Sequence, residues 1–351
     1  MKGLIDSTLR EGGQMVGVNF TLDQKLAIVA RLDRLGIEEI EVGIATRLDQ
    51  ELPALLAGCR EMGSRARLAL WCRCREEDIE EAARLKPDVL SLSIPASDLH
   101  ITKKLGKNHG WVLTTLARSI KMARELGCRL ISLGLEDATR AGKAFLEEII
   151  ATAMAAGIDR IRLADTVGVA TPAEMADLVR TLKGRFAIEV GVHCHNDFGM
   201  ASANSLAAIE AGADWADVTV YGIGERAGNA RLEEVAGFLA LRGRRRYVVR
   251  ELKELVALAA GCCGKEIDPH HPVVGAKIFH CETGLHLQGL EIDSSTYEAY
   301  PPEAVGAGRK LLYGGKIGRR QRRRLAAEPA PGRRLTSEIS GIDCSGIQVS
   351  N

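Results

Sequence analysis

The sequence lacks several features that would place it in a familiar class of protein. No apolar run approaches the roughly 20 residues that a helix needs to cross a membrane, and the opening residues, MKGLIDSTLR, are too few and too polar for a signal peptide. Lysine and arginine number 47 against 46 aspartates and glutamates, so no excess of positive charge favours nucleic acid or membrane binding. We therefore expect a protein that binds neither nucleic acid nor membranes.

The nine cysteines also lack the C-x-x-C spacing of many redox and metal sites. Several lie in apolar segments. The cysteines of the WCRC and GCCG segments are typical of reduced thiols rather than of a disulfide framework. We therefore expect a cytoplasmic protein.

What the chain does contain is a regular alternation of apolar runs and amphipathic segments. Eight runs are typical of β-strands: 4–9, 39–44, 66–71, 89–94, 129–135, 160–165, 187–195 and 215–224. Helical periodicity occupies residues 21–36, 75–86, 114–127, 143–157, 171–184 and 203–212. This α/β alternation, ending near residue 240, predicts a parallel (β/α)8 TIM barrel. A doubly wound sheet is the alternative, because strand order cannot be read from sequence.

Beyond the predicted barrel, the chain is expected to contain a small subdomain and a tail. With 46% hydrophobic and 26% charged residues, the chain has enough apolar surface for a substantial core. We expect a catalytic barrel over residues 1–245 and a small C-terminal subdomain over 246–318. Hydrophobic periodicity is lost from residue 319 onward, where an arginine cluster begins. Residues 319–351 are therefore predicted to form a flexible basic tail.

Two of the eight histidines, His193 and His195, stand two residues apart at the end of an apolar strand. Side chains at i and i+2 point to the same face of a strand, so both imidazoles face one point. Such a pair suits a metal ion, but it also arises by chance, and either ring could bond to neighbouring backbone instead. The pair alone leaves both interpretations open.

Other polar residues follow the predicted strands at their carboxyl ends, where TIM-barrel enzymes carry their catalytic groups. They are Arg10, Glu11, Glu41, Glu136, Asp137, Asp165, Thr166 and the segment 222–229. A solvated rim would also be polar, so no single residue decides the matter. Their convergence on one mouth predicts an active site there.

Six motifs in order resemble one family of enzymes. They are DSTLREGGQ (6–14), EVGI (41–44), LGLEDATRA (133–141), LADTVGVATP (163–172), HCHNDFGMA (193–201) and GIGERAGNARLEEV (222–235). Over residues 4–318 the chain is similar to the homocitrate synthases and isopropylmalate synthases, which are Claisen-condensing TIM-barrel enzymes. Glu11 directly after Arg10, and the GLEDATRA segment, resemble the homocitrate synthases of the nitrogenase-associated bacterial branch more than the isopropylmalate synthases.

The resemblance implies an acyltransferase that condenses acetyl-CoA with a 2-oxo acid, and 2-oxoglutarate, giving homocitrate, is the favoured one. It implies a divalent metal ion held by Glu11, His193 and His195, with Asn229 as a fourth ligand. One carboxylate and two imidazoles leave open positions for the 2-oxo acid and do not select sharply among Mg²⁺, Mn²⁺ and Zn²⁺.

The resemblance also implies roles for the residues around the metal. Arg10 would stabilise the charge that develops on the ketone oxygen. The expected substrate-binding residues are Gln14, Glu41, Thr166, Arg47 and Arg73. Among these, Arg47 and Arg73 are the cations that barrel geometry places nearest the second carboxylate of 2-oxoglutarate.

Proton transfer from acetyl-CoA is expected to involve the segment beyond the barrel. The family carries a His and, eleven positions later, a Tyr in this segment, and His286 and Tyr297 preserve that offset. Glu136 would assist from the barrel side. The resemblance implies a homodimer in which this segment reaches the mouth of the partner's barrel, and a neutral His is suited to proton transfer at neutral pH.

Some residues depart from the family pattern and keep alternatives open. Gly13 stands where Glu is usual, Cys281 stands where His is common, and the segment 314–318 matches its motif only in part. Oxaloacetate, pyruvate and 2-oxoisovalerate remain possible substrates of the same condensation. A metal-dependent lyase or aldolase, and a non-catalytic binding protein, are the alternatives from other functional classes.

Overall fold

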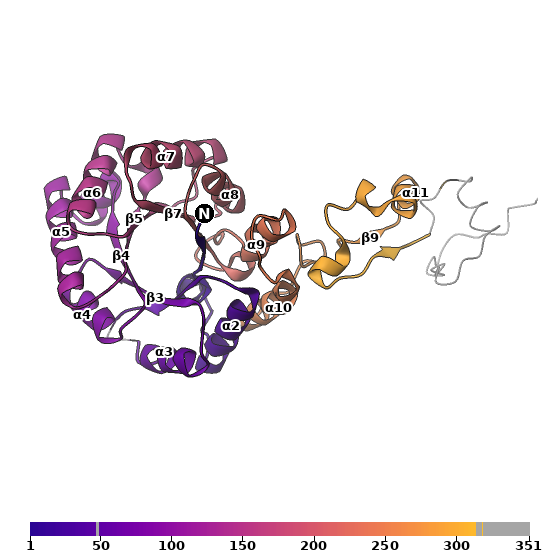
Figure 1. Ribbon diagram of the computed structural model, residues 1–351, viewed down its shortest axis with the longest axis horizontal. Helices are drawn as coiled ribbons and strands as arrows, with labels where there is room; N and C mark the ends of the chain where they lie inside the picture. Colours follow the sequence, from indigo (N-terminus) through magenta and orange to yellow (C-terminus); the bar gives the residue numbers. More distant parts are fainter. Residues whose placement is uncertain (47–48, 314–317, 319–351) are drawn as a thin grey trace, which may run out of the picture. The chain divides into compact units, whose positions relative to one another are not determined.

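Eight parallel strands close into a barrel in the computed structural model, which describes residues 1–46, 49–313 and 318 (Figure 1). The strands are β1 Gly3–Asp6, β2 Glu39–Ile44, β3 Arg67–Arg73, β4 Val89–Pro95, β5 Ile131–Glu136, β6 Arg160–Asp165, β7 Glu189–Cys194 and β8 Trp215–Val218. Each pairs with its neighbour in sequence, and β1 also pairs with β8, which closes the ring. The TIM-barrel prediction is confirmed, and a doubly wound sheet is excluded because its sheet would stay open.

Helices surround the strands, as Figure 1 shows. They are α1 Thr8–Glu11, α2 Leu22–Leu35, α3 Leu52–Glu61, α4 Glu76–Arg84, α5 His109–Glu125, α6 Lys143–Ala155, α7 Pro172–Arg185, α8 Ala201–Glu210, α9 Leu232–Leu241 and α10 Leu252–Cys262. Helix α3 was not among the helices predicted from sequence; its proline lies in the first turn, where a missing N–H costs no intrahelical bond. No helix in the described part of the chain is long and apolar enough to span a bilayer.

Charged side chains fill the barrel interior at the amino ends of the strands. The guanidinium of Arg160 donates to both carboxylate oxygens of Glu39, at 2.6 and 3.1 Å, and to the hydroxyl of Ser132 at 3.1 Å. It also lies 5.0 Å from the centroid of the Trp215 ring. A guanidinium this deeply buried requires a paired charge. The cluster therefore fills one end of the barrel and leaves the carboxyl ends of the strands for a site.

The described residues fall into two compact units, of which the first ends at residue 267 and the second begins at residue 268. Helix α10 packs against α2 and so belongs to the first unit, which ends later than the limit of 245 expected from sequence. In the second unit, α11 Gly284–Ile292 and the short strands β9 His280–Cys281 and β10 Lys310–Leu311 surround a small core of Leu287 and Tyr313. The predicted tail, 319–351, lies outside the described residues.

Candidate metal centre and active site

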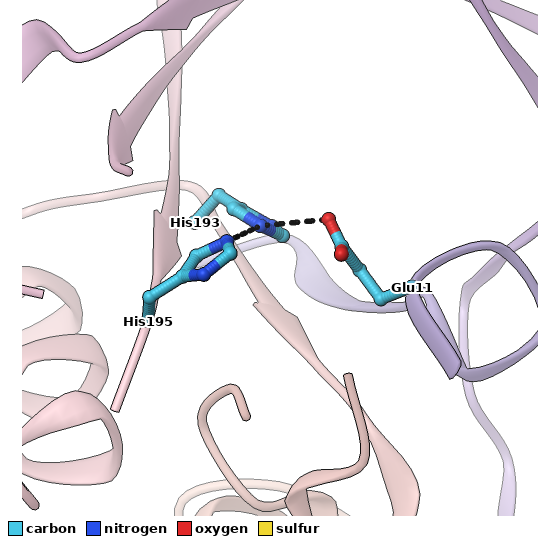
Figure 2. Close-up of side chains that lie close together, drawn as sticks. All are labelled: Glu11, His193 and His195. Atoms are coloured by element: carbon cyan, nitrogen blue, oxygen red, sulfur yellow. Dashed lines mark hydrogen bonds and ion pairs between the residues drawn. The ribbon is translucent and has the colours of Figure 1, made fainter. Parts of the chain in front are cut away.

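Glu11, His193 and His195 form a buried cluster at the carboxyl end of the barrel (Figure 2). Their candidate ligand atoms all lie within 4.8 Å of one another. Nε2 of His193 lies 3.1 Å from Oε1 of Glu11 and 3.0 Å from Nε2 of His195. His193 is near the end of β7 and His195 directly follows this strand, so the two side chains point to the same face; Glu11 reaches them from the end of α1.

The donor set fits a divalent metal ion. Within the described part of the chain, Oε2 of Glu11 and Oδ1 of Asn229 are buried and have no hydrogen-bond partner. The Asn229 amide nitrogen donates to the Ile223 carbonyl at 3.2 Å, and this contact leaves Oδ1 as the free end. Buried oxygens without partners are costly unless something binds them, and carboxylate, amide and imidazole together suit a divalent cation.

Burial keeps both imidazoles in the neutral form that a ligand needs. It lowers the pKa of His195 to about 2, with further lowering from His193 and Arg226. Burial also lowers the pKa of His193, against an opposing effect of Asp217. Because Oδ2 of Asp217 lies 2.7 Å from Nδ1 of His193 and a carboxylate only accepts, Nδ1 carries the proton. Nε2 of His193 therefore has a free lone pair that faces the centre of the cluster.

Arg10 is held beside this cluster by two carboxylates. Its Nε donates to Oε2 of Glu41 at 2.6 Å, and its Nη1 pairs with Oε1 of Glu11. Burial raises the pKa of Glu41, but the charges of Arg10 and Arg162 outweigh it and lower that pKa to about 2. The guanidinium of Arg10 is thus fixed next to Glu11, where it can stabilise negative charge on a bound oxygen.

A cavity of about 360 Å³ opens beside the cluster. Seven of the residues expected from sequence line it: Arg10, Glu11, Gln14, Glu136, Thr166, His193 and His195. Glu225, from the polar segment 222–229 expected at the mouth, also lines it, and six further residues were not expected: Trp71, Ser93, Lys104, Gly134, Arg162 and Ala164. The structure therefore gathers residues from seven of the eight strands, or the loops that follow them, around one space.

The expected residues hold different positions in this cavity. Oε1 of Glu136 accepts from the ammonium of Lys104 at 2.7 Å. The Thr166 hydroxyl accepts from the backbone N–H of Asp137 at 2.8 Å. Gln14 lines the cavity from an exposed position.

Two of the expected substrate-binding residues, Glu41 and Arg73, are not in the lining that the structure describes. Glu41 is fully buried behind Arg10. The guanidinium of Arg73 makes two hydrogen bonds to Asp78, at 2.6 and 3.0 Å, and its side chain does not line the cavity. Arg47 lies outside the described residues.

In the second unit, the His286 and Tyr297 rings lie in contact. Their centroids are 4.1 Å apart and their planes are tilted by 31°. A Cβ at Gly289 would lie 2.5 Å from the Tyr297 ring, so the glycine makes room for it. The assignment of this pair to proton transfer stays a prediction.

Sequence reasoning missed Lys104 and Arg162, for different reasons. Lys104 ends a π-helix, Leu99–Lys104, that lies between β4 and α5 and carries no recognised motif. Arg162 did have a signal, because Arg160 and Arg162 alternate on one face of an otherwise apolar strand. Charges repeated at i and i+2 in a barrel strand indicate a charged interior.

Two family models match the chain. A model described as HMGL-like matches residues 3–260, and one described as homocitrate synthase post-HMGL domain-like matches residues 273–326. Together they span both compact units of the structure.

Curated relatives with different printed activities match almost equally well. The chain is 38% identical over 322 residues to 2-isopropylmalate synthase 2 of Caldanaerobacter subterraneus subsp. tengcongensis, covering 89% of this chain and 81% of the relative. It is 38% identical over 325 residues to homocitrate synthase of Frankia alni, covering 90% of each. A putative (R)-citramalate synthase of Archaeoglobus fulgidus is 36% identical over 319 residues, covering 90% of this chain and 65% of that protein. Identity alone does not separate these activities.

Solved structures support the barrel fold. Hydroxymethylglutaryl-CoA lyase from Pseudomonas aeruginosa superimposes with a TM-score of 0.68 at 18% identity, covering 76% of this chain and 94% of that one. The N-terminal domain of a putative aldolase from Bacteroides vulgatus gives a TM-score of 0.62 at 19% identity, covering 85% and 97%. At these identities the likeness shows the fold alone.

Proposed function

The chain belongs to the HMGL-like family, and on that basis we propose that it condenses acetyl-CoA with 2-oxoglutarate to give homocitrate and CoA. Within the family it is an enzyme related to the homocitrate, isopropylmalate and citramalate synthases, which join acetyl-CoA to a 2-oxo acid. The choice of 2-oxoglutarate among the possible 2-oxo acids is our proposal.

The polarity of the cavity is the observation that supports 2-oxoglutarate as the substrate. In the closed strand order, β3 and β4 lie across the barrel from β7 and β8. The wall opposite the two histidines therefore includes Trp71, Ser93 and the nearby Lys104. Among the described residues that line the cavity, the apolar side chains are those of Trp71 and Ala164.

This wall suits a substrate whose far end is polar. A branched aliphatic end, as in 2-oxoisovalerate, would bury polar groups of the wall without giving them a partner. A second carboxylate would instead meet the Ser93 hydroxyl and the Lys104 ammonium, which are a donor and a cation. A site built to bind a polar group rejects analogues that lack it more strongly than an apolar pocket rejects a shorter chain.

The residues around the cluster then take distinct parts. A bound divalent ion, Mg²⁺, Mn²⁺ or Zn²⁺, held by Glu11, His193, His195 and Asn229, would polarise the ketone. Arg10 would stabilise the negative charge that forms on the ketone oxygen when the new carbon–carbon bond is made. Gln14 and Thr166 would hold substrate oxygens through hydrogen bonds.

Proton transfer completes the reaction. The acetyl-CoA methyl group must lose a proton before its carbon attacks the ketone, and we assign this step to His286 with Tyr297, assisted by Glu136. The ring contact between His286 and Tyr297 supports their working as a pair. A homodimer in which this pair serves the partner's barrel is part of the proposal.

We also propose a cytoplasmic location. The eight cysteines in the described part of the chain are free thiols, as is usual in a reducing compartment.

Release of CoA, measured with a panel of 2-oxo acids, tests the function. We expect the highest kcat/KM with 2-oxoglutarate and a much lower value with 2-oxoisovalerate. The Glu11→Ala variant serves as the control for background thioester hydrolysis. A preference for oxaloacetate would indicate citrate formation, and a preference for pyruvate or 2-oxoisovalerate would refute the homocitrate assignment.

A further inference from the structure

Asp217 is a buried carboxylate that contacts a candidate metal ligand without being one. It lies on β8, is 2% exposed, and its Oδ2 accepts the Nδ1 proton of His193 at 2.7 Å. Because that contact fixes which nitrogen carries the proton and how the ring is turned, it sets the direction of the Nε2 lone pair.

Arg162 joins this carboxylate to a second one. Its Nη1 lies 3.0 Å from Oδ2 of Asp217 and 3.0 Å from Oε1 of Glu41. Glu41 in turn holds Arg10 through a 2.6 Å hydrogen bond. A continuous series of buried, charge-assisted contacts thus runs from the ring of His193 to the guanidinium of Arg10.

The strands on both sides of Arg162 leave space for its side chain to contact Asp217 and Glu41. Arg162 on β6 pairs in register with Gly134 on β5 and with Gly191 on β7, so both flanking positions lack a side chain. A Cβ at Gly191 would lie 3.5 Å from Cγ of Arg162 and 3.4 Å from Cβ of Trp215. A side chain larger than alanine at position 191 would therefore compete with Arg162 for the space through which it reaches β8.

We propose that Asp217 is a positioning residue for His193 and that Arg162 holds Asp217 in place. Through its contact with Glu41, Arg162 also couples the orientation of the metal ligand to that of Arg10. The inference rests on the proposed metal site and adds the residues that keep that site in order. It predicts that changes at Asp217 and Arg162 weaken metal binding although neither side chain is assigned as a ligand.

Metal affinity tests this directly, without reference to turnover. Binding of Mn²⁺ is measured by electron paramagnetic resonance of the free ion, on full-length protein whose fold is checked by circular dichroism. Loss of an outer partner of a ligating histidine typically costs about 10- to 100-fold in metal affinity. We expect Asp217→Ala to weaken Mn²⁺ binding toward the upper end of this range. Asp217→Asn, whose carbonyl still accepts from Nδ1, should fall near the lower end.

Glu39→Gln is the matched control. Glu39 is a fully buried barrel carboxylate that pairs with Arg160 and Arg67. Its substitution removes the same charge from the barrel interior, so Mn²⁺ affinity should stay near that of the unaltered protein. Arg162→Met should weaken Mn²⁺ binding while Asp217 itself is unchanged.

The possible outcomes separate the two levels of the proposal. If Asp217→Asn folds and binds Mn²⁺ as tightly as the unaltered protein, Asp217 is not a positioning residue, and this criterion holds even if Asp217→Ala does not fold. Equal weakening by Glu39→Gln would assign the effect to general disturbance of the barrel and overturn the inference. Failure of the unaltered protein to bind Mn²⁺ would instead refute the metal site itself, and this inference with it.

Discussion

Gly224 and Asn229 approach so closely that a Cβ on the glycine would lie 2.1 Å from the Asn229 side-chain nitrogen. Any side chain at position 224 must therefore displace the Asn229 amide, the group whose free Oδ1 is proposed as the fourth metal ligand. The loop after β8 consequently needs glycine at this position so that Asn229, the proposed ligand, has room for its amide group.

The Gly224→Ala variant should lower metal affinity by an amount similar to that of Asn229→Ala. Asn229→Ala deletes the amide oxygen, and Gly224→Ala is expected to displace it from the position where we propose that it binds the metal. Isothermal titration with Mn²⁺ measures the effect. Gly184→Ala is the control, since a Cβ there meets nothing within 4 Å and alanine suits a helix. Unchanged affinity in Gly224→Ala would exclude Asn229 from the metal centre.

Removal of a proposed ligand should abolish turnover and preserve the fold. We expect His193→Ala and Glu11→Ala to reduce CoA release by several orders of magnitude, because the ketone loses its polarising ion. Their circular dichroism spectra should match that of the unaltered protein, since the ligands lie at the barrel mouth. Treatment with a chelator should have the same effect, reversed by adding Mn²⁺. Full turnover after exhaustive metal removal would refute the metal-assisted reaction.

The sequence predicted the barrel strands well where apolar alternation continues to the strand end. The predicted ranges 39–44 and 160–165 agree with β2 and β6 residue for residue. The predicted strand 215–224 is too long, because β8 ends at Val218 and Tyr221 takes a left-handed conformation with φ of 57°. An apolar pattern cannot show where such a turn begins, since the turn is fixed by contacts such as the Tyr221 N–H with Glu233.

The site was predictable to the extent that its residues stand in motifs at strand ends. Glu11, His193 and His195 were expected together, and the structure gathers them within one small volume. Lys104 reaches the cavity through the path of a long segment after β4, and no local pattern encodes that path. The pairing of Arg73 with Asp78 also depends on the tertiary position of α4, so sequence spacing alone left Arg73 available for substrate.

Asp6 should make the stability of the protein depend on pH. Burial raises the pKa of Asp6 from 3.8 to about 7. The folded state therefore binds more protons than the unfolded state between these values, and the contribution of Asp6 to the free energy of unfolding decreases as the pH rises from about 4 to about 7. In Asp6→Asn this contribution is absent.

The free energy of unfolding, measured with urea at pH 5 and at pH 8, tests this prediction. The loss of stability between the two pH values should be smaller in Asp6→Asn than in the unaltered protein. Asp177→Asn is the control, because the Asp177 side chain is 67% exposed. The same pH dependence in Asp6→Asn and in the control would contradict the assignment to Asp6.

Hybrid dimers should recover activity if the second unit serves a partner's barrel. Arg10→Ala and His286→Ala should each be inactive, because the first lacks the group that stabilises the oxyanion and the second lacks the proposed base. Mixing the two proteins under conditions that exchange subunits should restore some CoA release, since a hybrid contains one intact combination. The absence of activity in hybrids identified by differential tags would exclude the shared site.

Lys104 should determine how well the enzyme binds a second carboxylate. Its ammonium lines the cavity, and its side chain is 53% exposed beside Glu136. We expect Lys104→Met to raise KM for 2-oxoglutarate by about 10-fold or more, with a smaller effect on kcat, because a charge-assisted contact to the far carboxylate is lost. Lys103→Met is the matched control, since Lys103 is an exposed neighbour that does not line the cavity.

Pyruvate distinguishes the two ways in which Lys104 could act. Pyruvate has no second carboxylate, so any slow turnover of pyruvate should be insensitive to Lys104→Met if the ammonium binds the far end of 2-oxoglutarate. If Lys104 acts instead by holding Glu136, both substrates should lose activity by the same factor, because Glu136 is proposed to assist the acetyl-CoA step that they share. Steady-state CoA release with each acid, in the Lys104 and Lys103 variants, measures the ratio that separates these cases. An equal loss with both acids would remove Lys104 from substrate selection.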